Sequence, residues 1–191
     1  MNKGIIIGIV VALVILIGIA VLIPISIKNG LIAKDETVNE AWAQIETQLQ
    51  RRIDLIPNLV NTVKGYAKHE KEVFTAVSNA RAQLLSAQTP TEKANANGMV
   101  KSSLGRLLAI AEKYPDLKAN ESFIRLQDEL AGTENRIAVS RGRYNARVKE
   151  YNASIRKFPG SMFAASLKLE KRDYFQASPQ AKAAVAPKVE F

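Results

Sequence analysis

Residues 4–27, GIIIGIVVALVILIGIAVLIPISI, form 24 consecutive positions without a charged side chain. A helix of that length spans ~36 Å, which is enough to cross the ~30 Å hydrocarbon core of a bilayer with some tilt. The apolar part of a cleaved signal peptide is usually only ~7–15 residues long and leads to a small-residue cleavage site, whereas this run ends in LIPISI. We therefore expect a retained, single transmembrane anchor over residues 1–30.

The charges beside the apolar run do not orient it in the membrane. Lys3 precedes the run, and Lys28 and Lys34 follow it, so the positive-inside rule finds almost no asymmetry to use. The chain contains no cysteine, which excludes lipoprotein attachment, disulfides, thiolate nucleophiles and thiolate metal sites. The direction of insertion is left open.

The rest of the chain is basic, with 26 Lys and Arg against 18 Asp and Glu after Lys3. The excess is spread evenly and suits a protein held near anionic lipid headgroups, where each Lys or Arg near the surface contributes ~1 kcal/mol. A basic chain also suits nucleic acid, but no zinc-finger spacing, aromatic-basic sheet motif or Gly-rich clamp accompanies the charge. We expect the bilayer, and no nucleic acid, as a partner.

Beyond the anchor, apolar residues recur at the three- and four-residue spacing of an amphipathic helix, beginning with Val38, Trp42, Ile45, Leu49 and Ile53. This helix either starts at a cap formed by Asp35 or Thr37, or continues the anchor helix. Pro57 disfavours helical geometry at the residue before it. Either a long helix kinks there, or one helix ends near Arg52 and the next begins with Asp54 as its cap.

Further helix signals follow along the chain. The apolar stripe is expected to resume after Pro57 through Leu59, Val63, Tyr66, Phe74, Val77 and Leu84. Thr89-Pro90-Thr91-Glu92 has the form of a capping box for a third helix, which Tyr114-Pro115 ends. Asn120 starts a fourth helix, whose apolar rhythm continues to the stop signal at Pro159-Gly160.

These elements predict an all-α fold. We expect an N-terminal transmembrane helix followed by an antiparallel bundle of about four long helices and a short C-terminal helix near Met162, Phe163 and Leu167. The expected organisation is an anchor over residues 1–30, a helical bundle over residues 31–170 and an extended tail over residues 171–191. The tail has too little apolar content to fold alone.

Residues with a recognisable catalytic or metal-binding pattern are absent from the sequence. His69 begins a zinc-protease-like HEKEV, but the position of the second histidine is Val73. A di-metal bundle would need Glu-x-x-His motifs, and neither those nor a Gly-rich phosphate loop occur. We expect no catalytic, cofactor or metal site, and no enzyme.

Polar residues on or beside the apolar stripes are the unusual feature. They are either a specific network or face that meets another chain, or the wet edges of the bundle. The candidates for an oligomer contact or polar network are Asn58, Asn61, Asn135, Arg136, Arg141, Asn145 and Asn152. Three apolar residues near the C-terminus are candidates for a clip onto a neighbouring copy, namely Tyr174, Phe175 and Phe191.

Several segments together resemble the LemA family of bacterial membrane proteins. They are VNEAWAQIETQLQRRIDLIPNLVNTVKGYAKHE at 38–70, the pair Ala80-Arg81, DELAGTENRIAVSRGRYNARVKEYNASIRKFP at 128–159, Tyr174-Phe175 and the closing PKVEF. One departure is MFAASLKL at 162–169, where a Gly-Phe pair is expected. The resemblance implies a helical bundle on a single-pass anchor in the bacterial inner membrane, with no enzymatic role. The family's relatives include a magnetosome-membrane protein, which points to membrane organisation.

Our leading hypothesis is a non-enzymatic scaffold that self-associates as a homo-oligomer to organise or shape the membrane. The alternative is an adaptor that recruits another envelope protein, such as a protease or a stress component. An enzyme or a small-ligand binder is the third hypothesis, and a closed pocket holding Arg136 or Arg141 against carboxylates would favour it.

Overall fold

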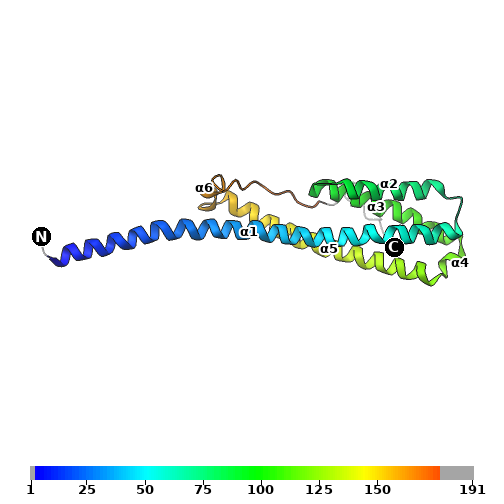
Figure 1. The fold of residues 1–191 in the computed structure, drawn as a ribbon, viewed down its shortest axis with the longest axis horizontal. Coiled ribbons are helices and arrows are strands. Elements are labelled where there is room, and N and C mark those ends of the chain that lie inside the picture. The colour runs from blue at the N-terminus through cyan, green and yellow to red at the C-terminus, as the bar shows by residue number, and fades with distance from the viewer. Residues whose placement is uncertain (1–2, 177–191) are drawn as a thin grey trace, which may run out of the picture. The chain divides into compact units, whose positions relative to one another are not determined.

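A computed structural model describes residues 3–176 of the chain, and within this range it contains helices and no strand. The all-α fold class is confirmed. In chain order the elements are α1 (Lys3–Tyr66), α2 (Lys71–Ser86), α3 (Pro90–Ile110), the 3₁₀ turn η1 (Ala111–Lys113), α4 (Pro115–Lys118), α5 (Glu121–Arg156) and α6 (Gly160–Ala164) (Figure 1).

Packing groups these elements into two compact units. The anchor unit comprises Met1–Glu40 and Ala146–Arg172, and the bundle unit comprises Ala41–Asn145 and Asp173–Phe191. Helices α1 and α5 each contribute to both units. The expected organisation into an anchor over residues 1–30, a helical bundle over residues 31–170 and a tail over residues 171–191 stays a prediction.

The apolar start of α1 is exposed on every side. Its described large apolar side chains between residues 6 and 25 are 41–67% exposed, and an 18-residue window of the helix has a mean hydropathy of 3.5 with none of it buried. A water-soluble helix buries one apolar stripe and exposes polar residues elsewhere. Among the described residues, α1 is the one helix long and apolar enough to cross a membrane, as expected of a membrane anchor.

In the anchor unit, α6 lies beside the part of α1 that follows the apolar run (Figure 1). Gly160 is buried and stands so close to α5 that an added Cβ would overlap the backbone oxygen of Ser154 and lie 3.3 Å from Leu31. The Lys28 ammonium lies 5.8 Å from the centre of the Phe163 ring. These contacts place the end of α5 and all of α6 beside the part of α1 that immediately follows its apolar run.

In the bundle unit, the last part of α1, α2, α3 and the first part of α5 bury one shared apolar core (Figure 1). Each fully buried Leu, Ile or Val contributes ~1.5–3 kcal/mol relative to an exposed position. The side chains with 0–1% exposure include Ile45, Ile56, Leu59, Val63, Val77, Leu84, Val100, Leu107, Leu117 and Phe123. The apolar stripes predicted from the sequence thus form the core.

Helix α1 runs through Pro57 and through Asp35 without a break. Of the alternatives that the sequence left open, continuation of the anchor helix is confirmed. Caps at Asp35, Thr37 and Asp54 are wrong, because these residues lie inside the helix. Pro57 has no N–H for the carbonyl of Ile53, the acceptor four residues earlier. The Arg81 Nε donates to that carbonyl at 3.2 Å instead. A side chain of α2 thus replaces the backbone bond that proline removes.

The chain turns at residues 67–70, between α1 and α2. The expected continuation of one apolar stripe from Tyr66 to Phe74 is therefore wrong. Tyr66 is 41% exposed, whereas Ala67 is buried in the turn, and the Ala67 N–H donates to the Val63 carbonyl at 2.9 Å. The apolar residues on the two sides of the turn belong to separate helices that share the core.

Local capping chemistry starts the next helices. Thr89 and Glu92 form the predicted capping box at the start of α3, and the N–H groups of Gln88 and Thr89 hold the pKa of Glu92 below its ordinary value. The side-chain oxygen of Asn120 accepts from the N–H of Phe123 at 3.0 Å and caps α5. Helix α5 ends at Arg156, just before the predicted Pro159-Gly160 stop.

Candidate functional site

Residues 169–176 follow α6 without regular structure, and α5 holds their backbone. In the anchor unit, the Asn152 side chain forms a two-bond clamp on Arg172. Its amide donates to the Arg172 carbonyl at 2.9 Å, and its oxygen accepts from the Arg172 N–H at 2.9 Å. The Tyr151 hydroxyl donates to the carbonyl of Glu170 at 2.9 Å.

The Arg172 side chain makes an ion pair within the same unit. Its Nη2 lies 2.9 Å and its Nε 3.1 Å from Asp35 Oδ1 on α1, and Nη2 also donates to Asn39. Burial alone would lower the pKa of Arg172, but the carboxylate of Asp35 outweighs it and raises the pKa. Burial, followed by the charge of Asp35, raises the pKa of Tyr151. Arg172 therefore stays charged and joins its segment to α1.

The bundle unit contains a second clamp of the same design. The Asn145 amide donates to the Phe175 carbonyl at 3.1 Å, and the Asn145 oxygen accepts from the Phe175 N–H at 2.9 Å. The Tyr144 hydroxyl donates to the carbonyl of Asp173 at 2.8 Å. Phe175 is 2% exposed, and its ring centre lies 6.1 Å from that of Trp42, which also contacts Tyr144.

The two clamps share one spacing rule. Tyr-Asn occurs at 144–145 and again at 151–152, seven residues apart, which is ~10.5 Å of helix. The backbone groups that the two pairs bind are three residues apart, which is ~10 Å of extended chain. The seven-residue spacing of the Tyr-Asn pairs on α5 and the three-residue spacing of the backbone groups that they bind therefore have about the same length.

A buried charge network joins α1, α3 and α5 in the bundle unit. Arg52 is 3% exposed and donates to the side chains of Asn97 and Glu134. Lys101 also donates to Glu134, at 3.0 Å. Burial by itself raises the pKa of Glu134, but the hydrogen bonds and charges of Arg52 and Lys101 outweigh it, so the pKa lies below its ordinary value.

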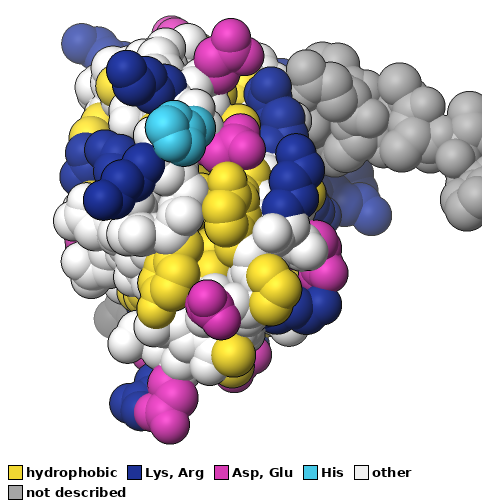
Figure 2. Space-filling model, turned by 90° about the vertical axis from the view of Figure 1, so that its right-hand side faces the viewer, with side chains coloured by type: hydrophobic (Ala, Val, Ile, Leu, Met, Phe, Trp, Pro, Cys, Tyr) yellow, Lys and Arg dark blue, Asp and Glu magenta, His cyan; other side chains and the backbone are white. Residues whose placement is uncertain are grey.

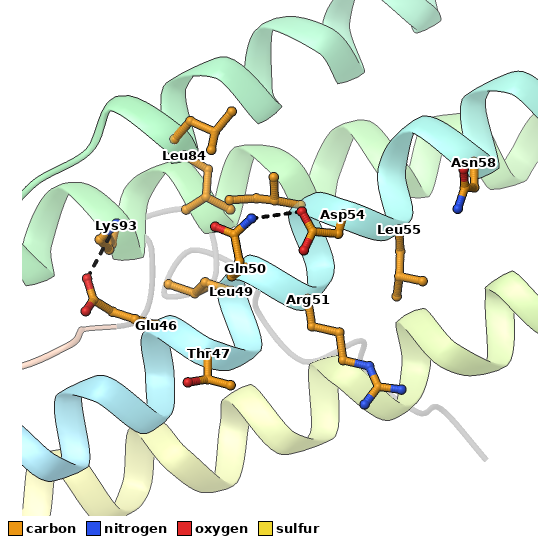
Figure 3. Close-up of a pocket in the computed structure, with 12 residues that line it drawn as sticks. Glu46, Thr47, Leu49, Gln50, Arg51, Asp54, Leu55, Asn58, Leu84 and Lys93 are labelled. Carbon is orange, nitrogen blue, oxygen red and sulfur yellow. Dashed lines mark hydrogen bonds and ion pairs between the residues drawn. The ribbon is translucent and has the colours of Figure 1, made fainter.

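An open groove of about 820 Å³ lies over α1, α2 and α3 in the bundle unit (Figure 3). Its charged groups are already paired: Glu46 lies 3.8 Å from Lys93 and Arg51 lies 2.8 Å from Glu129. Gln50 donates to Asp54 at 2.8 Å. Arg51 lowers the pKa of Glu129. The groove holds self-paired surface charges and no converging acid, base and nucleophile.

A second open groove, of about 490 Å³, lies between α1 and α5 in the bundle unit, and we call it the α1–α5 groove. It contains two of the predicted residues, Asn135 and Arg136, and both are exposed. Val139 beside them is 54% exposed. The side-chain oxygen of Gln48 is buried without a hydrogen-bond partner. The lining residues are Gln44, Thr47, Gln48, Asn135, Arg136, Val139, Ser140 and Arg143.

The remaining candidates are dispersed. Asn58 and Asn61 are exposed on α1, with Asn58 at one end of the 820 Å³ groove (Figure 3), and Arg141 is half-buried on α5. Tyr174 is half-buried in the bundle unit, whereas Phe191 lies outside the described residues. The predicted clip onto a neighbouring copy stays a prediction, although Phe175 packs within its own chain.

Metal ligands do not gather in the described part of the chain, where no group of three or more His, Cys, Asp or Glu side chains could hold an ion. His69 is exposed in the turn between α1 and α2. Figure 2 shows this end of the bundle unit, where apolar side chains lie among both basic and acidic ones. This face carries no field of a single sign that would gather a charged substrate.

Sequence reasoning missed the partners of the clamps. It singled out Asn145 and Asn152 but not Arg172, Tyr144 or Tyr151, and it assigned Asp35 to a helix cap instead of an ion pair. The signal that would have found them is the repeated Tyr-Asn pair, since a hydroxyl and an amide side by side suit an extended backbone.

The chain has recognisable relatives. Residues 41–191 match the model of the LemA family. Magnetosome protein MamQ 2 of Paramagnetospirillum magneticum is 27% identical in an alignment 177 residues long, and the alignment covers 79% of this chain and 65% of that protein. Magnetosome protein MamQ of Magnetospirillum gryphiswaldense is 26% identical with the same coverage. Protein LemA of Metamycoplasma hominis is 26% identical over 163 residues, covering 85% of this chain and 74% of that protein.

The chain thus spans less than two thirds of the length of the two magnetosome relatives. The names of the family and of these relatives are not the names of enzymes.

Proposed function

This chain belongs to the LemA family, and we propose that it is a non-enzymatic membrane scaffold whose copies associate to organise or shape a bacterial membrane. The exposed apolar part of α1 supports the membrane anchor. The naming of its relatives as magnetosome proteins supports a role on a membrane surface.

The observation that carries self-association is the α1–α5 groove. Asn135 and Arg143 line the same groove without a hydrogen bond or ion pair to the described chain, and Val139 offers an exposed apolar contact. A second copy that presents carboxylates and apolar groups would satisfy the exposed side chains of Asn135, Arg143 and Val139 at once.

Disulfide crosslinking in native membranes tests the proposal. The chain has no cysteine, so Val139→Cys supplies a single thiol in the groove, and Lys68→Cys supplies a matched exposed thiol at the end of the bundle unit. We expect a homodimer adduct from Val139→Cys and little from Lys68→Cys. The detergent-extracted chain should also have a protein mass well above 21.0 kDa.

Two results would contradict the scaffold. One is a monodisperse 21.0 kDa protein by light scattering together with no adduct at position 139. The other is a single abundant adduct with a different protein, which would favour the adaptor instead.

A further inference from the structure

The junction of α5 and α6, residues 156–162, exposes two large apolar side chains, and we call it the α5–α6 turn. Phe158 is 81% exposed and Met162 is 66% exposed. Leu22, at 67%, is the most exposed of the described large apolar side chains in the apolar run of α1. Phe158 is more exposed than Leu22, and Met162 is about equally exposed. Burial of a large apolar side chain away from water is favourable, so this turn presents apolar surface that an apolar partner would cover.

The turn lies next to the predicted membrane boundary. The anchor unit contains both the apolar run and α6, so their placement belongs to one compact unit (Figure 1). Gly160 packs against Leu31, and Phe163 lies beside Lys28, the first charged residue after the run. Leu31 is four residues, or ~6 Å of helix, past Ile27. The headgroup layer on each side of the hydrocarbon core is ~5–8 Å thick, so the turn is level with the headgroups.

The charges around the turn have one sign. The segment 153–169 contains Arg156, Lys157 and Lys168 and no Asp or Glu, and residues 26–34 of α1 contain Lys28 and Lys34 and no acid. The nearest acid on α1, Asp35, is paired with Arg172, and Glu170 follows the segment. Basic groups close to a membrane surface attract anionic lipids.

We propose that the α5–α6 turn is a second membrane contact, which inserts Phe158 and Met162 into the interface of a bilayer containing anionic lipids. Arg156, Lys157 and Lys168 bind the lipid phosphates around the inserted side chains. Aromatic side chains favour this interface. Segments that lie in the interface without spanning the membrane combine apolar side chains, which insert, with basic side chains, which stay at the headgroups. The inference rests on the proposed anchoring by α1, and it ties the end of α5 to the surface from which α1 emerges.

Spin labels on single cysteines measure the depth of each position in the full chain. The chain is reconstituted in vesicles of phosphatidylethanolamine and phosphatidylglycerol. Nitroxides are placed at Phe158→Cys and Met162→Cys, with Leu16→Cys inside the apolar run and Lys149→Cys on the exposed side of α5 as controls. Oxygen concentrates in lipid and a nickel chelate in water, so the ratio of their relaxation effects reports depth.

We expect the oxygen-to-nickel ratio at positions 158 and 162 to exceed that at position 149 several-fold, and to remain below that at position 16. In vesicles of phosphatidylcholine alone, the ratio should fall at positions 158 and 162 and stay unchanged at position 16. Replacement of Arg156, Lys157 and Lys168 by Gln should have the same effect in vesicles that contain phosphatidylglycerol.

Ratios at 158 and 162 equal to that at 149, with position 16 in lipid, would overturn the second contact and leave the anchor intact. A water-exposed label at position 16 would instead contradict the proposed anchoring. An unchanged depth in phosphatidylcholine would overturn the role of the basic side chains.

Discussion

At the scale of single residues, polar side chains bond backbone groups that have no helical partner. Asn152 and Asn145 each hold both the N–H and the carbonyl of one residue in the segment after α6. Arg81 bonds the carbonyl that Pro57 leaves open. These side chains lie beside apolar stripes because the backbone groups they bond are themselves part-buried and need partners.

Replacing Asn152 tests the clamp of the anchor unit. Asn152→Ala removes both bonds to Arg172 and should destabilise the chain by about 2 kcal/mol, because a part-buried N–H and carbonyl lose their partner. Unfolding by denaturant in detergent, followed by circular dichroism, measures the loss. Asn61→Ala, at an exposed position of α1, is the control and should change stability by less than about 0.5 kcal/mol. Equal losses in both variants would disprove the clamp.

The pH dependence of stability reports the Arg52 network. The pKa of Glu134 is lowered in the folded chain from its ordinary value of 4.5, so the folded state binds fewer protons than the unfolded state. Its stabilising contribution is present above pH 4.5 and is lost as the pH falls below 4.5 through the folded pKa. Glu134→Gln should be less stable than wild type at pH 7, and the difference should shrink on acidification. Parallel stability curves down to pH 3 would contradict this assignment.

At the scale of elements, α1 shows how a distant contact overrides a local signal. A proline inside a helix costs about 3 kcal/mol or more, and on local grounds the sequence left a kink or a break at Pro57 as the alternatives. The helix passes through because α2 supplies a donor from 28 residues away. The chain turns instead at residues 67–70, where no proline stands.

A double-mutant cycle measures this compensation. Arg81→Met should cost about 1–2 kcal/mol in the wild-type chain, because it leaves the Ile53 carbonyl without a donor. Pro57→Ala supplies the missing N–H, so Arg81→Met should cost clearly less in that background. Thermal or denaturant unfolding of the four chains gives the coupling. Equal costs in both backgrounds would show that Arg81 does not substitute for the backbone bond.

The contrast between local signals and distant contacts explains which features the sequence could predict and which it could not. Thr89 and Asn120 cap their helices through groups three residues away, so the capping signal was sufficient. The apolar stripes placed the core because burial follows helical periodicity. The pairs Asn152–Arg172 and Arg52–Glu134 lie 20 and 82 residues apart, and no local pattern names the partner of a polar side chain over such distances. The polar residues were therefore found and their partners were not.

At the scale of the whole molecule, we expect the apolar run of α1 to decide whether the chain is integral to a membrane. Leu13 and Leu16 are 54% and 66% exposed in the middle of the run. A lysine at the centre of a transmembrane helix costs about 2.5–3.5 kcal/mol, so the double variant Leu13→Lys/Leu16→Lys should move from the carbonate-resistant membrane pellet to the soluble fraction. Lys substitutions at Thr75 and Ser86, exposed on α2, are the control and should leave the chain in the pellet.

The two clamps also have an evolutionary consequence, because they bond peptide groups and not side chains. Substitutions at positions 172 and 175 leave the clamp bonds possible for every residue except proline, which has no N–H to donate. An inserted residue between them would lengthen the interval by ~3.4 Å, while the Tyr-Asn pairs keep their seven-residue helical spacing. Among homologous chains, the clamps should therefore hold the residue count of this segment constant, whereas the ion pair of Arg172 and the packing of Phe175 constrain its side chains.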